Sequence, residues 1–185
     1  MLPREVHPSA CANSGRDRAF SVSYLSIYLN DHLAGATIGV ELAKRTLGSN
    51  RGTEFELPLS KLTAEIVEDR QTLTALMERL GVPRRSWKVT GAFLAEKVAR
   101  LKLNGQVVGY SPLSRVVELE SLQLGVEGKA AMWRTLREFA GWDKRIDGQE
   151  MARLERRAGN QRRGLEELRV AAARIAFSDS SGVSE

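Results

Sequence analysis

The sequence predicts an all-α fold, an up-down bundle of about five helices. Apolar residues recur at intervals of three and four along most of the chain, and helix start and stop signals separate the periodic segments. Only residues 106–110 could form a strand, and that segment is short. We therefore expect a single helical domain at residues 21–177, between flexible tails at residues 1–20 and 178–185.

The first expected helix covers residues 22–47 and ends at Gly48. Its apolar stripe consists of Leu25, Leu29, His32, Ala36, Val40, Ala43 and Leu47. Gly35 and Gly39 lie inside it, four residues apart. Small residues at this spacing predict that another backbone packs closely against the helix.

The second expected helix starts near Pro58 and ends before Gly81. Its seam consists of Leu59, Leu62, Ile66, Asp69, Leu73, Leu76 and Leu80. The seam alternates intervals of three and four and has one polar member, Asp69. A third helix is expected at residues 86–104, with Ser86 as its N-cap.

The fourth expected helix covers residues 111–141, with Ser111 as N-cap and Pro112 at the first position. Its first half is apolar on two arcs. One arc consists of Leu113, Val116, Val117 and Leu124, and the other of Leu119, Leu122, Val126 and Trp133. Two apolar arcs predict a central helix that packs between its neighbours.

The fifth expected helix starts at Asp147, an N-cap followed three residues later by Glu150. Its seam consists of Met151, Leu154, Ala158, Gln161, Leu165, Leu168, Ala172 and Ile175. Val170 and Phe177 lie off this seam, and we expect a homodimer that associates through this helix. The short connections predict sequential antiparallel packing.

Composition favours a cytoplasmic protein. The chain has 185 residues and a single cysteine, Cys11, which cannot form an internal disulfide. No apolar run is long enough to span a membrane, and residues 1–20 lack the apolar core of a signal peptide.

The formal charge of +5 raises the question of nucleic-acid binding. However, glutamates alternate with the basic residues of 150–167, so pairing along a solvated helix explains these charges. Aromatic residues make up only 6% and do not alternate with the basic ones. We therefore rank a basic nucleic-acid-binding bundle third among the functional hypotheses.

Three ionisable residues interrupt the apolar stripes: His32, Asp69 and Glu120. Counting residues from each turn places Asp69, Glu96 and Glu120 at one level, with His32 about one turn away. A buried lone charge costs several kcal/mol, so these groups must pair, change protonation or bind a ligand.

Two interpretations of this polar layer follow. In the favoured one the layer is structural, and Lys97, Arg100 or Arg115 neutralises the carboxylates. In the alternative, Asp69, Glu96, Glu120 and His32 bind a divalent metal, because carboxylates and imidazole on facing helices form such sites in bundles.

The helix lengths, the up-down order and the acidic and histidine residues on inner faces resemble the ferritin-like superfamily. This resemblance implies a ferritin-like architecture and, for the alternative interpretation, an iron or manganese site. The family motif is a Glu on each of two helices and Glu-x-x-His on each of the other two. Neither His7 nor His32 follows a glutamate by three residues, so the motif is absent.

No phosphate-binding glycine loop, dinucleotide-binding glycine motif or Gly-x-Ser-x-Gly elbow is present. The sequence thus predicts a non-enzymatic oligomeric or interaction protein with a buried polar layer and no cofactor.

Overall fold

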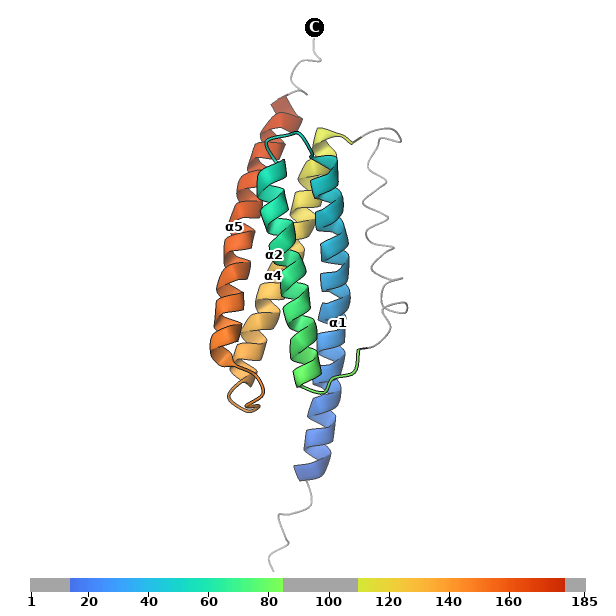
Figure 1. Cartoon of the computed structure of the whole chain (residues 1–185), viewed down its shortest axis with the longest axis vertical. Helices are drawn as coiled ribbons and strands as arrows, with labels where there is room; N and C mark the ends of the chain where they lie inside the picture. The colour runs from blue at the N-terminus through green and yellow to red at the C-terminus, as the bar shows by residue number, and fades with distance from the viewer. Residues whose placement is uncertain (1–13, 85–109, 179–185) are drawn as a thin grey trace, which may run out of the picture.

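The computed structural model describes residues 14–84 and 110–178, and these residues form four α-helices and no strand. The helices are α1 (Ser14–Ser49), α2 (Glu56–Arg79), α4 (Pro112–Phe139) and α5 (Gly148–Ser178) (Figure 1). The all-α class is confirmed. The helix expected at residues 86–104 lies outside the described residues.

The four helices form a bundle with a square cross-section. α1 packs against α2 and α4, and α5 packs against α4 and α2, so α1 and α5 lie at opposite corners. α1 and α5 run in one direction, while α2 and α4 run in the other (Figure 1). Each helix is therefore antiparallel to both of its principal neighbours. The α4–α5 pair has the most extensive contact.

The core follows the predicted seams closely. All seven seam residues of α2, Asp69 included, are buried, and six of the eight seam residues of α5 are buried. Trp133 of α4 and Phe55, just before α2, are the largest fully buried side chains. The heptad pattern thus identified the inward faces of α2 and α5 correctly, because burial of apolar side chains is the dominant stabilising contribution.

The predicted helix starts of α4 and α5 are confirmed by their caps. Ser111 Oγ accepts a hydrogen bond from the Ser114 backbone N–H at 3.1 Å. Asp147 Oδ1 accepts from the Gln149 N–H at 2.8 Å and from the Glu150 N–H at 3.3 Å. These side chains satisfy amide groups that have no partner within the helix.

The end of α2 is closed by a glycine in the left-handed region. Gly81 has φ +69°, its N–H donates to the Glu78 carbonyl, and the Val82 N–H donates to the Met77 carbonyl. This pair of bonds is a Schellman motif, which favours glycine at that position.

Two predictions about α1 differ from the structure. The helix begins at Ser14, whereas the sequence predicted a tail through residue 20 and a start near Val22. Among the described residues, a Cβ added at Gly35 or at Gly39 would meet nothing within 4 Å. No described residue therefore makes the close backbone contact expected at these glycines, which helix propensity disfavours.

α4 packs between α5 and α1, as predicted, but its second apolar arc is buried only in part, at Val116. Its arc containing Leu119, Leu122 and Val126 is buried, but Leu113 and Leu124 on the other arc are 44% and 76% exposed. α4 thus has one face in the core and an apolar face on the surface. No helix among the described residues has both the length and the hydropathy required to cross a membrane.

Candidate functional site

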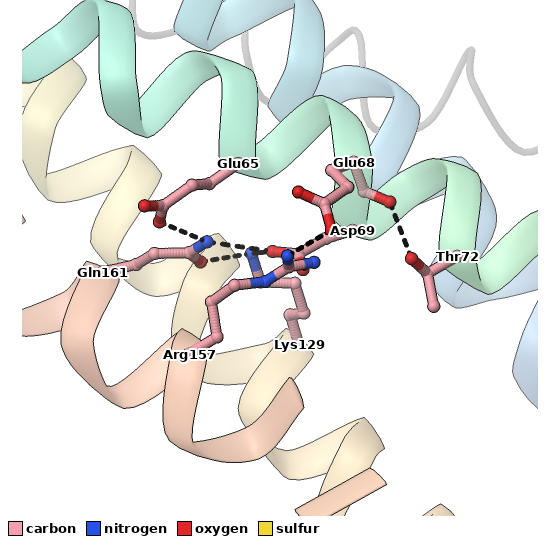
Figure 2. Close-up of polar contacts among 7 residues, drawn as sticks. All are labelled: Glu65, Glu68, Asp69, Thr72, Lys129, Arg157 and Gln161. Carbon is pink, nitrogen blue, oxygen red and sulfur yellow. Dashed lines mark hydrogen bonds and ion pairs between the residues drawn. The ribbon is translucent and has the colours of Figure 1, made fainter. Parts of the chain in front are cut away.

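A cluster of polar side chains lies in the interior, centred on Asp69 of α2. Asp69 is 2% exposed, and both of its carboxylate oxygens accept hydrogen bonds from cations. Lys129 of α4 donates to Oδ2, and Arg157 of α5 donates to Oδ1 (Figure 2). The two cations approach from different helices, so Asp69 joins α2 to α4 and to α5.

Gln161 of α5 completes the inner part of this cluster. Its Nε2 donates to Asp69 Oδ2 at 3.1 Å and to Glu65 Oε2 at 3.1 Å. Its Oε1 accepts from Lys129 Nζ at 2.6 Å. The amide therefore uses donor and acceptor together, which satisfies a buried polar group that would otherwise cost about 1–3 kcal/mol.

Arg157 extends the cluster towards the surface. Its Nη1 lies 2.6 Å from Oε1 of Glu68, whose side chain is 58% exposed. Burial acts to lower the pKa of Arg157, but the Glu68 and Asp69 carboxylates raise it above its ordinary value. The guanidinium therefore stays charged and bridges two carboxylates one residue apart on α2.

Lys129 is the second cation that contacts Asp69. Burial lowers its pKa, the Asp69 carboxylate opposes that shift, and the positive charge of Arg157 adds to it. Its side chain is only 14% exposed. Charge neutralisation by Asp69 is therefore a condition for burying this ammonium group.

We interpret the cluster as a structural cross-link. Polar seam residues of α2, α4 and α5 meet at the same level along the bundle axis. Moving any of these three helices along its axis by one turn would separate the charged groups. Buried ionic groups of this kind contribute little net stability but fix axial register. The geometry does not resemble an open metal site, because cations already occupy both Asp69 oxygens. The described residues also contain no group of three or more His, Cys, Asp or Glu side chains that could hold a metal ion.

Of the residues of the alternative metal hypothesis, Glu120 and His32 do not form a metal-binding group with Asp69. Glu120 is exposed on α4 and lies 3.8 Å from Arg169, so its expected place on an inner face was wrong. His32 is half-buried on α1, with its ring 4.5 Å from that of Tyr28 in an edge-on arrangement. Burial lowers the pKa of His32, and Asp31 opposes this shift. Glu96 lies outside the described residues.

The predicted level of Glu120 failed for a geometric reason. Asp69 meets α4 at Lys129, nine residues beyond Glu120, or about 14 Å along the helix axis at about 1.5 Å per residue. Counting residues from turns assumes tight turns, whereas a long connection separates α2 from α4. The favoured structural layer does exist, but Lys129 and Arg157 neutralise Asp69. Of the predicted partners, Arg115 donates to Asn50, and Lys97 and Arg100 lie outside the described residues.

A sequence signal for the true partners was available. Lys129 follows Val126 by three residues and precedes Trp133 by four, so it continues the buried arc of α4. Gln161 likewise interrupts the apolar seam of α5. The polar residue that interrupts each apolar seam is therefore the signal that identifies these two residues as partners of Asp69. Arg157 lies beside the seam and gives no such signal.

A second polar network joins the end of α1 to the start of α4. Asn50, which is fully buried, donates to the Tyr110 hydroxyl at 2.8 Å and accepts from Arg115. The Tyr110 hydroxyl donates to Glu118 at 3.1 Å, and Glu118 also binds Arg45 at 3.0 Å. Burial raises the pKa of Tyr110 to about 12, with a smaller contribution from Glu118 in the same direction.

Neither network contains a nucleophile paired with a base. In both, polar side chains hydrogen-bond to one another, although Nε of Arg157 is buried without a partner. In the described part of the chain, the buried polar groups therefore connect the helices to one another, and they form no open reaction centre. Comparisons of the chain with protein-family models, with curated proteins and with solved structures found no match.

Proposed function

We propose that this chain is a non-enzymatic interaction protein that forms a homodimer through the outer face of α4. The observation that carries this proposal is an exposed, uncharged strip that runs along α4. The interior supports it indirectly, because the buried polar groups are used to hold the helices in register.

The strip follows the side of α4 that is turned away from the core. Its exposed members are Leu113, Leu124, Gly128, Ala131 and Thr135, and its half-buried members are Val117 and Ser121. Intervals of three and four residues place all of these on one helix face. Leu124, at the middle of the strip, is 76% exposed. An exposed apolar face on a long helix is typical of a protein–protein contact.

A second copy of the chain is the partner that best fits the strip. Leu124 projects from the helix, and Gly128, one turn away, has no side chain and no described residue within 4 Å of an added Cβ. A two-fold axis between two α4 helices would place each Leu124 over the partner's Gly128. Such a contact is self-complementary, as a symmetric dimer requires.

This proposal moves the expected dimer contact from α5 to α4. The outward face of α5 carries exposed arginines at positions 153, 156, 163 and 174, which would repel the same face of a second copy. The strip on α4 contains no charged residue, and the exposed Glu120 and Glu127 along its edge lie near Arg169 and Arg162 of α5. The dimer and the cytoplasmic location both remain proposals.

We also propose a ferritin-like architecture. α2 and α4 run in the same direction, so a single long connection joins two antiparallel pairs, as in ferritin-like bundles. The arrangement of Asp69 with two cations supports a structural role for the inner acidic residues, and no observation favours the iron or manganese alternative.

Light scattering coupled to size-exclusion chromatography tests the dimer over a concentration series. The monomer mass is 20.5 kDa, and we expect twice that mass at high protein concentration. Leu124→Arg should give the monomer mass throughout. Leu57→Arg is the matched control, because Leu57 is 83% exposed on α2 and lies outside the strip. A wild-type monomer at all concentrations, or equal effects of the two substitutions, would contradict the proposal.

A further inference from the structure

The outward face of α5 carries a row of arginines. Arg153, Arg156, Arg163 and Arg174 are all exposed. They are separated by three, seven and eleven residues, which places them on one face of the helix, opposite its buried seam. The row is about 30 Å long at about 1.5 Å per residue.

The glutamates of α5 do not neutralise this row, contrary to what the sequence suggested. Glu150 binds Arg79 of α2 at 2.9 Å. Glu155 binds Arg134 at 3.2 Å and Arg137 at 2.7 Å, both on α4. These acidic side chains are thus turned sideways, towards the neighbouring helices.

Glu166 is engaged in the same way. It binds Arg169 at 2.7 Å and accepts from Gln123 of α4 at 3.2 Å. The Arg169 hydrogen bond lowers the pKa of Glu166 to about 2. Glu167 is the one acidic residue of α5 that shares the arginine face.

The arginines of the row have few partners of their own. Within residues 14–84 and 110–178, Arg153, Arg156 and Arg174 make no ion pair, and Arg163 contacts the Asn160 side chain at 2.5 Å. Exposed guanidinium groups that lack counter-charges create a positive potential along the helix. α5 contains seven arginines and four glutamates, so the helix contributes +3 to the overall formal charge of +5.

We propose that the arginine row binds the phosphate backbone of double-stranded nucleic acid without sequence preference. The planar guanidinium group matches phosphate geometry and stays charged at all physiological pH values. The length of the row is close to one turn of duplex, about 34–36 Å. Gln149 and Asn160 lie on the same face and add amide donors of the kind that contact phosphates. This inference goes beyond the proposed function and uses a different helix face.

The composition of the face argues against other polyanions. Single-stranded nucleic acid is bound with the help of stacking aromatic residues, and the positions between and including the four arginines on this face hold none. A membrane-surface helix needs an apolar face beside its basic one, whereas the opposite side of α5 is buried in the bundle. A protein interface has apolar or aromatic anchors at its centre, and this row has polar residues there.

Fluorescence anisotropy with a labelled 24-base-pair DNA duplex of arbitrary sequence tests the proposal over a series of salt concentrations. For the wild type we expect binding at 50 mM salt that weakens steeply as salt rises. Each phosphate contact contributes a slope of about −0.9 in the log–log plot, so replacing three arginines should make the slope shallower by about 2.7. The variant is Arg153→Gln, Arg156→Gln and Arg163→Gln together, and we expect its affinity at 50 mM salt to fall roughly tenfold or more.

The matched control is Lys44→Gln, Arg45→Gln and Arg51→Gln together. It removes the same formal charge at and just beyond the end of α1, the corner opposite α5. We expect its salt slope to equal that of the wild type, and circular dichroism should show both variants folded. Equal weakening by the control would contradict the proposal, as would the absence of wild-type binding at 50 mM salt. Tighter binding to single-stranded DNA of equal length, to phosphatidylserine vesicles or to polyglutamate would also contradict it.

Discussion

Asp69 on α2 and Lys129 on α4 are sixty residues apart in the sequence and form an ion pair in the interior of the bundle. Arg157 and Gln161 bring α5 to the same carboxylate. Replacing such a cluster with apolar residues is often neutral or stabilising, whereas removing one member is costly. The value of the cluster therefore lies in the helix register that it imposes.

Lys129→Met should destabilise the protein by about 1.5–3 kcal/mol, because Asp69 loses a charged hydrogen-bond donor and keeps Arg157. Urea unfolding monitored by circular dichroism measures this loss. The double variant Asp69→Leu with Lys129→Met should lose less than the sum of the single losses by about 1 kcal/mol or more, because the residues are in direct contact. Simple additivity would show that the two side chains are not coupled.

Tyr110 should make stability fall at high pH. Burial raises the pKa of its hydroxyl to about 12, so the folded state keeps the proton that the unfolded state loses near pH 10. The contribution of Tyr110 is thus present below pH 10 and is lost as the pH rises through 12. Urea midpoints of the wild type and Tyr110→Phe between pH 9 and 12 check this. The wild-type midpoint should fall more steeply, and parallel curves would be inconsistent with the network around Asn50.

Gly81→Ala should destabilise the protein by about 1–2 kcal/mol, because φ is +69° and an L-residue is strained there. Steric crowding is not the cause, since an added Cβ would meet no described residue within 4 Å. Gly48→Ala, in the helical part of α1, is the control and should stabilise by up to about 1 kcal/mol. Thermal unfolding of both variants measures the two effects separately. A Gly81→Ala variant as stable as the wild type would count against the Schellman motif.

The sequence predicted those features that depend on local chemistry and on one-dimensional periodicity. The α2 seam, the Ser111 cap and the Asp147 cap belong to this group, because a capping side chain bonds to amides only two or three residues away. Asp69 was identified as buried from its place in the seam alone.

Predictions from the sequence were wrong where they depended on how one helix packs against another. The exposure of Leu124 and the position of Glu120 were both mispredicted, because an apolar or polar residue on a helix does not reveal which side has a neighbour. The partner of Asp69 was missed for the related reason that residue counting gave the wrong level on α4. The packing role predicted for Gly39 also depends on a neighbouring helix, and no described residue lies within 4 Å of a Cβ added there.

The most direct test of the structural cross-link is urea unfolding of the wild type and Asp69→Leu, each with chelator and with added Fe(II), Mn(II) or Zn(II). Leucine keeps the approximate volume of aspartate and completes the apolar seam, but it leaves Lys129 and Arg157 without the buried carboxylate. We expect a loss of about 3–5 kcal/mol that is the same with and without metal. A variant as stable as the wild type without metal, together with a wild-type midpoint that rises with stoichiometric metal while the variant does not respond, would contradict the account.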